Sequence, residues 1–172
     1  MQNLINRIRS TKEGQLIALC ARPGDGRRTT AIALANELAR QGEAVHYFSY
    51  SKSPTALEER LDSAVVRLTA SDIPDAGVLI VDDLTAGATV LTLATPDSTK
   101  IAILSRLRKV AKERGLTIIV TDTHARHTSR RLPIPDAGLA LCDKAYVVYK
   151  KPISADDVDS AELPVIQLKE VV

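Results

Sequence analysis

Aromatic residues are scarce in this chain. Tyrosine and phenylalanine together make up 3% of its 172 residues, and tryptophan is absent. Proteins that bind single-stranded nucleic acid by stacking bases present several aromatic side chains on one surface. The scarcity therefore argues against a stacking platform of that kind. The formal net charge is also small, +2, so any nucleic-acid-binding surface must come from local clusters of basic residues.

Metal-binding cysteine motifs and long hydrophobic runs are missing as well. The two cysteines, Cys20 and Cys142, are far apart in the sequence and have no metal-ligand spacing. Cys20 ends an apolar run, so we expect it to be a small buried hydrophobe. No secretory signal is present, and no apolar stretch approaches the roughly 20 residues that span a membrane. These observations predict a cytoplasmic protein with reduced thiols and no membrane partner.

Segments typical of strands and helices alternate along the chain. Apolar runs predict strands at residues 16–20, 44–49, 78–81, 116–121, 145–149 and 165–168. Apolar residues at helical spacing predict helices after the first of these strands, over residues 54–68 and over residues 100–114. Residues 85–99 have no strong periodicity, so we expect a loop there.

This alternation predicts an α/β fold with a mostly parallel central sheet and helices on both faces. The length fits a single domain over residues 1–172. Residues 1–12 are expected to be a short N-terminal extension, and residues 154–172 a peripheral acidic loop and last strand. Polar clusters follow several strands, and ligands of such folds bind at the carboxyl ends of the strands. The sequence therefore predicts a functional site at this edge of the sheet.

The segment between the first strand and the first helix has the pattern of a phosphate-binding loop. Its sequence, ARPGDGRRTT at residues 21–30, is a glycine-containing turn that runs into a helical pattern. In this context backbone N–H groups surround a phosphate at the amino end of a helix. The residues expected to form a nucleotide-binding site are Arg22, Gly24, Gly26, Arg27, Arg28 and Thr29.

The order of the motifs resembles the ATPase domain of the DnaB-type replicative DNA helicases, which has the RecA-like P-loop fold. The similar segments are ARPG at residues 21–24, YFS at 47–49, the strand at 78–84, RLRKVAKERG and TIIVTDTHAR between 106 and 126, and residues 132–149. The resemblance covers approximately residues 14–150, with a weaker tail to 169. It implies ATP or ADP as the ligand and Asp82 as the Walker B acid that holds the water shell of Mg²⁺. It also places Arg126, Arg130 and Arg131 on a loop that holds single-stranded DNA.

The chain departs from the family at its catalytic positions. Arg27 stands where the family has the loop lysine, and Arg28 where it has the Mg²⁺-binding Ser or Thr. An arginine has no acceptor atom for a metal, and it is not a compact point charge like lysine. Ser51 replaces the catalytic glutamate, so no base there activates water. These departures predict weakened Mg²⁺ binding and little or no hydrolysis.

Two further departures concern the later motifs. The family's sensor glutamine aligns with Thr123. Its trans-acting Lys-x-Arg aligns with Lys169 and Val171, so the arginine finger is absent.

Three functions remain open at this point. The first is a degenerate helicase-like module of DNA replication or its regulation, which binds nucleotide, single-stranded DNA, a replicative helicase or another copy of itself. The second is an active minimal ATPase or helicase accessory, in which Arg28-Thr29 acts as a shifted Lys-Thr pair. The third is a protein-interaction regulator that binds no nucleotide.

The site residues also have plainer interpretations. The two loop arginines lie at the start of a helix, where the helix dipole disfavours cations and Asp25 can offset part of this cost. In the plainer interpretation both arginines point into water, where the cost is screened. Asp82 would cap a turn at the end of its strand, and the basic residues at 126–131 would lie on a solvated loop. Asp83 is expected to be a bystander.

Overall fold

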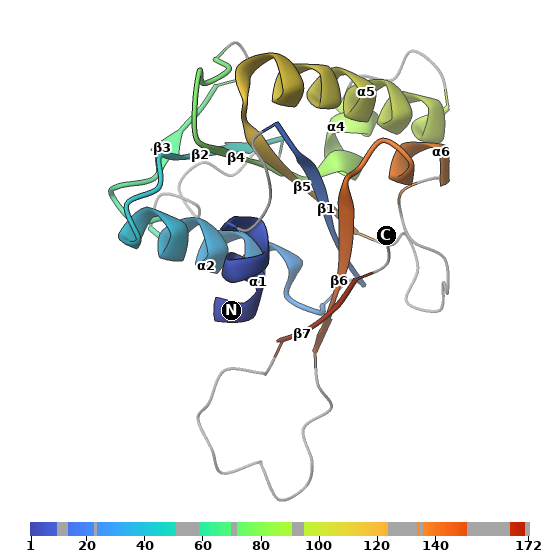
Figure 1. The fold of residues 1–172 in the computed structure, drawn as a ribbon. Helices are drawn as coiled ribbons and strands as arrows, with labels where there is room; N and C mark the ends of the chain where they lie inside the picture. Colours follow the sequence, from blue (N-terminus) through green and yellow to red (C-terminus); the bar gives the residue numbers. More distant parts are fainter. Residues whose placement is uncertain are drawn as a thin grey trace, which may run out of the picture.

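A mostly parallel sheet forms the centre of the fold, with helices on both faces (Figure 1). The computed structural model describes residues 1–9, 14–22, 24–50, 59–69, 72–90, 95–123, 134, 136–150 and 166–170. Within them the strand order is β3-β2-β4-β5-β1-β6-β7. The strands are β1 (Leu16–Ala21), β2 (Val45–Ser49), β3 (Val66–Arg67), β4 (Val78–Asp82), β5 (Thr117–Thr123), β6 (Lys144–Lys150) and β7 (Ile166–Glu170). The helices are α1 (Gln2–Arg9), α2 (Arg27–Arg40), α4 (Leu84–Val90), α5 (Pro96–Arg114) and α6 (Asp136–Leu139).

The neighbouring strands from β3 to β6 are parallel, and only the β6–β7 pair is antiparallel. Parallel strands end at a common edge, so the register places the ends of β1, β4 and β5 close together. Cys20 of β1 is level with Asp122 of β5, and Ser49 of β2 is level with Asp82 of β4. The predicted fold class is therefore confirmed, and the polar residues after β1, β4 and β5 share one edge.

Two apolar layers cover the sheet. One layer packs α1 and α2 against one face, and the other packs α4 and α5 against the opposite face (Figure 1). The N-terminal segment, expected only as an extension, forms α1 with Leu4, Ile5 and Ile8 buried in the first layer. Cys20 is buried as expected. No helix in the described ranges is long and apolar enough to cross a bilayer.

Two local predictions are wrong. Residues 84–90 form α4 rather than a loop, because the Asp83 carboxylate accepts the N–H of Ala86 and caps the helix at 2.7 Å. The helix expected over residues 54–68 is not formed where the structure describes it. The Asn36 side chain binds the Arg60 carbonyl and the Asp62 N–H there and stabilises turns. Residues 66–67 then pair with β2 as β3, while residues 54–58 lie outside the described ranges.

Candidate functional site

The glycine loop connects the end of β1 to the start of α2. Gly24 and Gly26 have φ values of 87° and 83°, in the left-handed region that favours glycine. A Cβ built on either glycine would meet no heavy atom within 4 Å, so the space beside the loop is open. No side chain caps α2, whose first backbone bond runs from Thr30 N–H to the Gly26 carbonyl. The preceding amides at this end of the helix are free to bind an anion.

Arg22 and Asp25 form a clamp across the loop. The Arg22 Nε donates to Asp25 Oδ2 at 2.9 Å, and the Asp25 N–H donates to the Arg22 carbonyl at 3.1 Å. The Asp25 carboxylate thus offsets the charge of Arg22, rather than that of the arginines in the helix. The clamp stabilises the turn that presents the two glycines.

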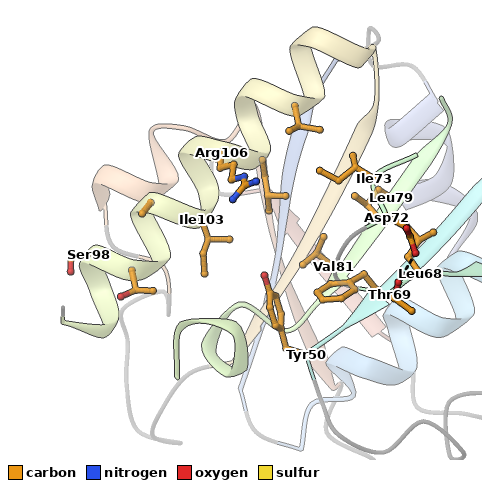
Figure 2. A pocket seen from close by; sticks show the side chains of 15 residues that line it. Tyr50, Leu68, Thr69, Asp72, Ile73, Leu79, Val81, Ser98, Ile103 and Arg106 are labelled. Atoms are coloured by element: carbon orange, nitrogen blue, oxygen red, sulfur yellow. Dashed lines mark hydrogen bonds between the residues drawn. The ribbon is translucent and has the colours of Figure 1, made fainter. Parts of the chain in front are cut away.

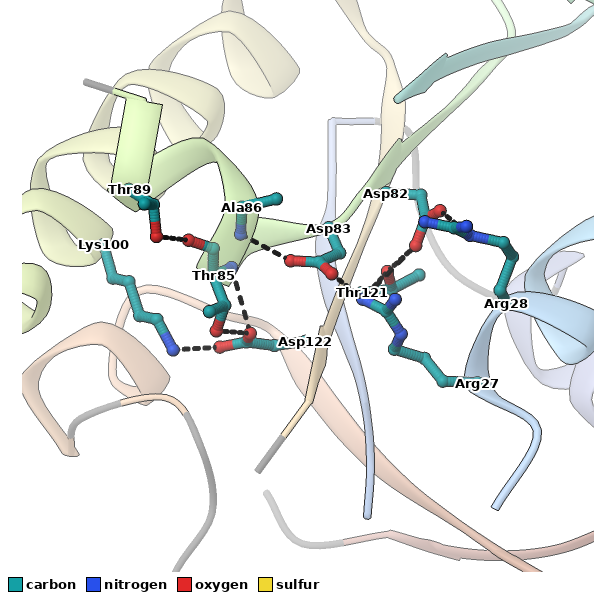
Figure 3. Close-up of polar contacts among 10 residues, drawn as sticks. All are labelled: Arg27, Arg28, Asp82, Asp83, Thr85, Ala86, Thr89, Lys100, Thr121 and Asp122. Carbon is teal, nitrogen blue, oxygen red and sulfur yellow. Dashed lines mark hydrogen bonds and ion pairs between the residues drawn. The ribbon is translucent and has the colours of Figure 1, made fainter. Parts of the chain in front are cut away.

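The side chains of the two arginines that start α2 extend to the end of β4 and form ion pairs there. Arg28 Nε lies 2.8 Å from Asp82 Oδ2. Arg27 Nη1 lies 2.8 Å from Asp83 Oδ2 and 3.3 Å from Asp82 Oδ1. Figure 3 shows both guanidinium groups directed at the acids. The Arg27 side chain is only 11% exposed, so the interpretation that it points into water is wrong.

Asp83 is a second acid of this cluster, and the expectation that it is a bystander is wrong. One of its carboxylate oxygens binds Arg27, and the other caps α4 at Ala86. The sequence contains a signal for this role, because Asp83 stands three residues before Ala86 at a helix start. Asp83 therefore connects the glycine-loop helix to α4.

Asp82 is 0% exposed and has both carboxylate oxygens engaged. Thr121 of β5 donates its hydroxyl to Asp82 Oδ1 at 2.7 Å and accepts Arg27 Nη1 at 3.3 Å. Charge-assisted hydrogen bonds of this kind stabilise a buried carboxylate. On the adjacent strand, burial raises the pKa of Tyr47 far above its usual range, and the negative charge of Asp82 raises it further. The four charges of Arg27, Arg28, Asp82 and Asp83 sum to zero, and we call these residues the arginine–aspartate cluster.

Mg²⁺ does not fit the arginine–aspartate cluster. A metal held between a P-loop and a Walker B acid needs a hydroxyl from the helix start and access to the carboxylate. Arg28 follows Arg27 at the helix start, where the resemblance predicts that hydroxyl, and its side chain binds Asp82. The neighbouring hydroxyl, that of Thr29, is exposed and accepts Arg60 Nη2 at 3.3 Å. That contact directs the Thr29 side chain to a partner outside the cluster.

A second buried cluster lies beside the first and was not predicted. Lys100 Nζ of α5 lies 2.6 Å from Asp122 Oδ2 at the end of β5. Thr85 of α4 donates to Asp122 Oδ1 through its hydroxyl at 2.6 Å and its N–H at 3.1 Å (Figure 3). The available signal was the position of Lys100, which precedes the buried Leu104 by four residues on the same helix face. This cluster holds α4, α5 and β5 together.

The remaining residues with predicted roles lie at the ends of described strands or outside the described residues. The expected DNA-binding residues Arg126, Arg130 and Arg131 lie outside the described residues, as do Ser51 and Val171. Thr123 is the last residue of β5, and Lys169 belongs to β7. The roles assigned to these residues stay predictions.

Solved structures share this fold. A solved ATPase domain matches with a TM-score of 0.67 and 11% identity, over 93% of this chain and 81% of that one. A DnaB-like replicative helicase, solved to study its interactions with primase, matches with a TM-score of 0.64 and 11% identity. That match covers 92% of this chain and 55% of the helicase, so the chain spans about half its length.

A KaiC-like protein, PH0186 from the hyperthermophilic archaeon Pyrococcus horikoshii OT3, also shares the fold. It matches with a TM-score of 0.57 and 18% identity, over 83% of this chain and 75% of that one. No protein-family profile and no curated protein matches the sequence. The similarities confirm the predicted resemblance to DnaB-type ATPase domains at the level of the RecA-like fold.

Proposed function

We propose that this protein is a non-hydrolysing relative of the helicase motor domain, acting as a binding module in DNA replication or its regulation. The observation that carries the proposal is that both carboxylate oxygens of Asp82 already have partners. Oδ2 binds Arg28, and Oδ1 binds Arg27 and Thr121. The acid that would hold a metal's water shell is thereby neutralised by the protein's own cations. Loss of the metal position removes charge stabilisation that phosphoryl transfer depends on.

The proposed ligand of the glycine loop is ATP or ADP bound without Mg²⁺. The loop retains two glycines with positive φ and an uncapped helix start, and both features suit a phosphate group. Arg27 and Arg28 start the same helix, and their pairing with Asp82 and Asp83 neutralises two acids that would otherwise repel that phosphate. Binding of this kind is insensitive to chelation of divalent cations.

Calorimetric titration of ATP and ADP, with Mg²⁺ and with EDTA, tests this proposal. We expect equal affinities in the two buffers and no release of phosphate on prolonged incubation with ATP. A measurable ATPase rate that disappears on Asp82→Ala would overturn the proposal. So would ATP affinity that is lost in EDTA.

The proposed partners are single-stranded DNA, a replicative helicase subunit or another copy of the chain. Three cations within six residues, Arg126, Arg130 and Arg131, suit sequence-independent contacts with phosphates. Retention on immobilised single-stranded DNA is expected to fall with rising salt. It is expected to disappear in the double variant Arg130→Ala/Arg131→Ala, and retention unchanged in that variant would contradict a DNA role for the loop.

A second candidate is a regulator that acts through protein contacts alone. The observation that favours it is the pairing of Arg27 with Asp82 and Asp83, which leaves its charge compensated before any anion binds. Absence of ATP and ADP binding in both buffers would support this candidate over the first. The shifted-loop ATPase needs the Thr29 hydroxyl at the metal position, and the contact of Thr29 with Arg60 argues against it.

A further inference from the structure

An apolar groove lies on the α5 face of the sheet and contains no member of the arginine–aspartate cluster. Its volume is about 640 Å³, within the range of roughly 300–1,000 Å³ for pockets that take small ligands. The groove lies between α5, the ends of β2 and β4, and residues 68–69 and 72–73 (Figure 2). Val81 lines it, whereas the next residue, Asp82, binds α2 on the other side of the sheet.

One wall of the groove is aromatic and held in place. The rings of Phe48 and Tyr50 meet edge to face, with centroids 4.7 Å apart. Gly87 of α4 leaves room for the Tyr50 ring, because a Cβ there would lie 2.6 Å from it. On the far rim, Arg114 donates to the Ile73 carbonyl and to Asp75 Oδ1, each at 2.8 Å. These contacts preform the groove and reduce the cost of ordering it around a ligand.

One cation faces this apolar lining. α5 carries Arg106 on the side that also presents Ile103 and Leu107 to the groove, and Figure 2 shows its guanidinium group directed into the space. Burial raises the pKa of Tyr50, and the positive charge of Arg106 opposes that rise. The Tyr50 hydroxyl and the Arg106 guanidinium group therefore interact electrostatically. Asp72, the acid on the opposite rim, accepts the Thr69 hydroxyl. No carboxylate in the described part of the chain pairs with Arg106.

We propose that this groove binds a small apolar molecule carrying one carboxylate. The apolar body packs between Ile103, Leu107 and the Phe48–Tyr50 pair, and the carboxylate forms a bidentate pair with Arg106. A single anionic group matches Arg106, the cation that lines the groove in the described residues. The lining is too apolar to solvate a triphosphate. The inference is independent of the proposed nucleotide role, because none of its residues belongs to the glycine loop.

The test is a titration of the ¹⁵N-labelled full chain, followed by amide chemical shifts. The probes are decanoate and decanol, which share chain length and differ in charge. We expect both to shift amides of the lining residues, with decanoate binding about tenfold tighter or more, as a hydrogen bond between charged groups provides. Arg106→Gln is expected to remove that difference. Lys109→Gln, a matched loss of charge on the exposed side of α5, is expected to retain it.

Three results would overturn the inference. The first is no shift of the lining amides by either probe. The second is equal affinity of the wild type for decanoate and decanol, or a preference for decanoate that survives Arg106→Gln. The third is concentration-dependent shifts of the lining amides without a probe, because a second copy of the chain would then cover the groove.

Ala102→Trp, which places a large side chain in the lining, is expected to abolish binding of both probes at an unchanged melting temperature.

Discussion

Arg28 Nε lies 2.8 Å from Asp82 Oδ2, so the second residue of α2 forms an ion pair with the last residue of β4. Two arginines at a helix start are unfavourable against the helix dipole by about 0.3–1 kcal/mol each. Asp82 and Asp83 at the end of β4 offset this cost and bind the arginines across the site. The cluster therefore holds α2 against the end of β4.

The two acids of the cluster are expected to differ in their effect on stability. Asp82→Asn removes the buried carboxylate that pairs with Arg28 and Arg27, and Arg28, which is 36% exposed, is left without an acid; we expect a loss of about 2 kcal/mol in the free energy of unfolding. Asp83→Asn retains an oxygen to cap α4 and leaves Arg27 with Asp82, so about 1 kcal/mol is expected. Urea denaturation monitored by circular dichroism measures both. A larger loss for Asp83→Asn than for Asp82→Asn would contradict this ranking.

The Lys100–Asp122 pair is expected to show strong coupling. Lys100→Met leaves the buried Asp122 without its cation, with an expected loss of about 3 kcal/mol. Combining it with Asp122→Asn removes the stranded charge and is expected to recover about 1 kcal/mol or more relative to Lys100→Met alone. A double-mutant cycle from urea denaturation gives the coupling. Additive losses would show that the pair does not act as a unit.

Helix α1 is expected to be part of the cooperative core. Ile5 is fully buried against the sheet layer, so Ile5→Ala is expected to cost about 3 kcal/mol. Asn6→Ala, an exposed change on the same helix, is the matched control and is expected to cost less than about 0.5 kcal/mol. Thermal and urea unfolding report both values. Similar small effects of the two changes would mean that α1 does not contribute to the core.

Stability is expected to fall in alkaline solution through the buried thiols. Burial raises the pKa of Cys142 from 9.0 to about 11, with Arg108 opposing the rise. The folded state thus keeps the thiol protonated, and its contribution is fully present below pH 9 and is lost as the pH rises toward 11. Over that interval the wild type is expected to lose on the order of 1 kcal/mol per pH unit more than Cys142→Ala. Urea midpoints measured under reducing conditions test this, and parallel pH profiles would refute it.

The sequence predicted the sheet well because its strands are short, nearly continuous apolar runs between polar turns. It missed α4, whose segment Leu84–Val90 contains glycine and threonine and has weak intrinsic helix propensity. That helix depends on the Asp83 cap and on burial of Leu84 and Ala88, both of which are tertiary effects.

The sequence predicted where the site residues lie but not which of them form ion pairs with one another. The sequence placed Arg27, Arg28 and Asp82 at one edge of the sheet, because loop motifs and strand ends are visible as local patterns. It did not show that the arginines bind the acids, since Arg28 and Asp82 are 54 residues apart. A side chain's choice between water, an anion and a distant carboxylate depends on packing that no local pattern encodes.

We propose that Arg27 and Arg28 occupy Asp82 in place of Mg²⁺. The most direct test compares ATP binding by two proteins in two buffers. ATP is titrated by calorimetry into the wild type and into Arg27→Lys/Arg28→Thr, each with Mg²⁺ and with EDTA. The double variant restores a lysine and a hydroxyl and frees Asp82 from its guanidinium partners. We predict that wild-type affinity is the same in both buffers and that the double variant binds about tenfold tighter or more with Mg²⁺. Wild-type binding that requires Mg²⁺, or a double variant indifferent to it, would contradict the account.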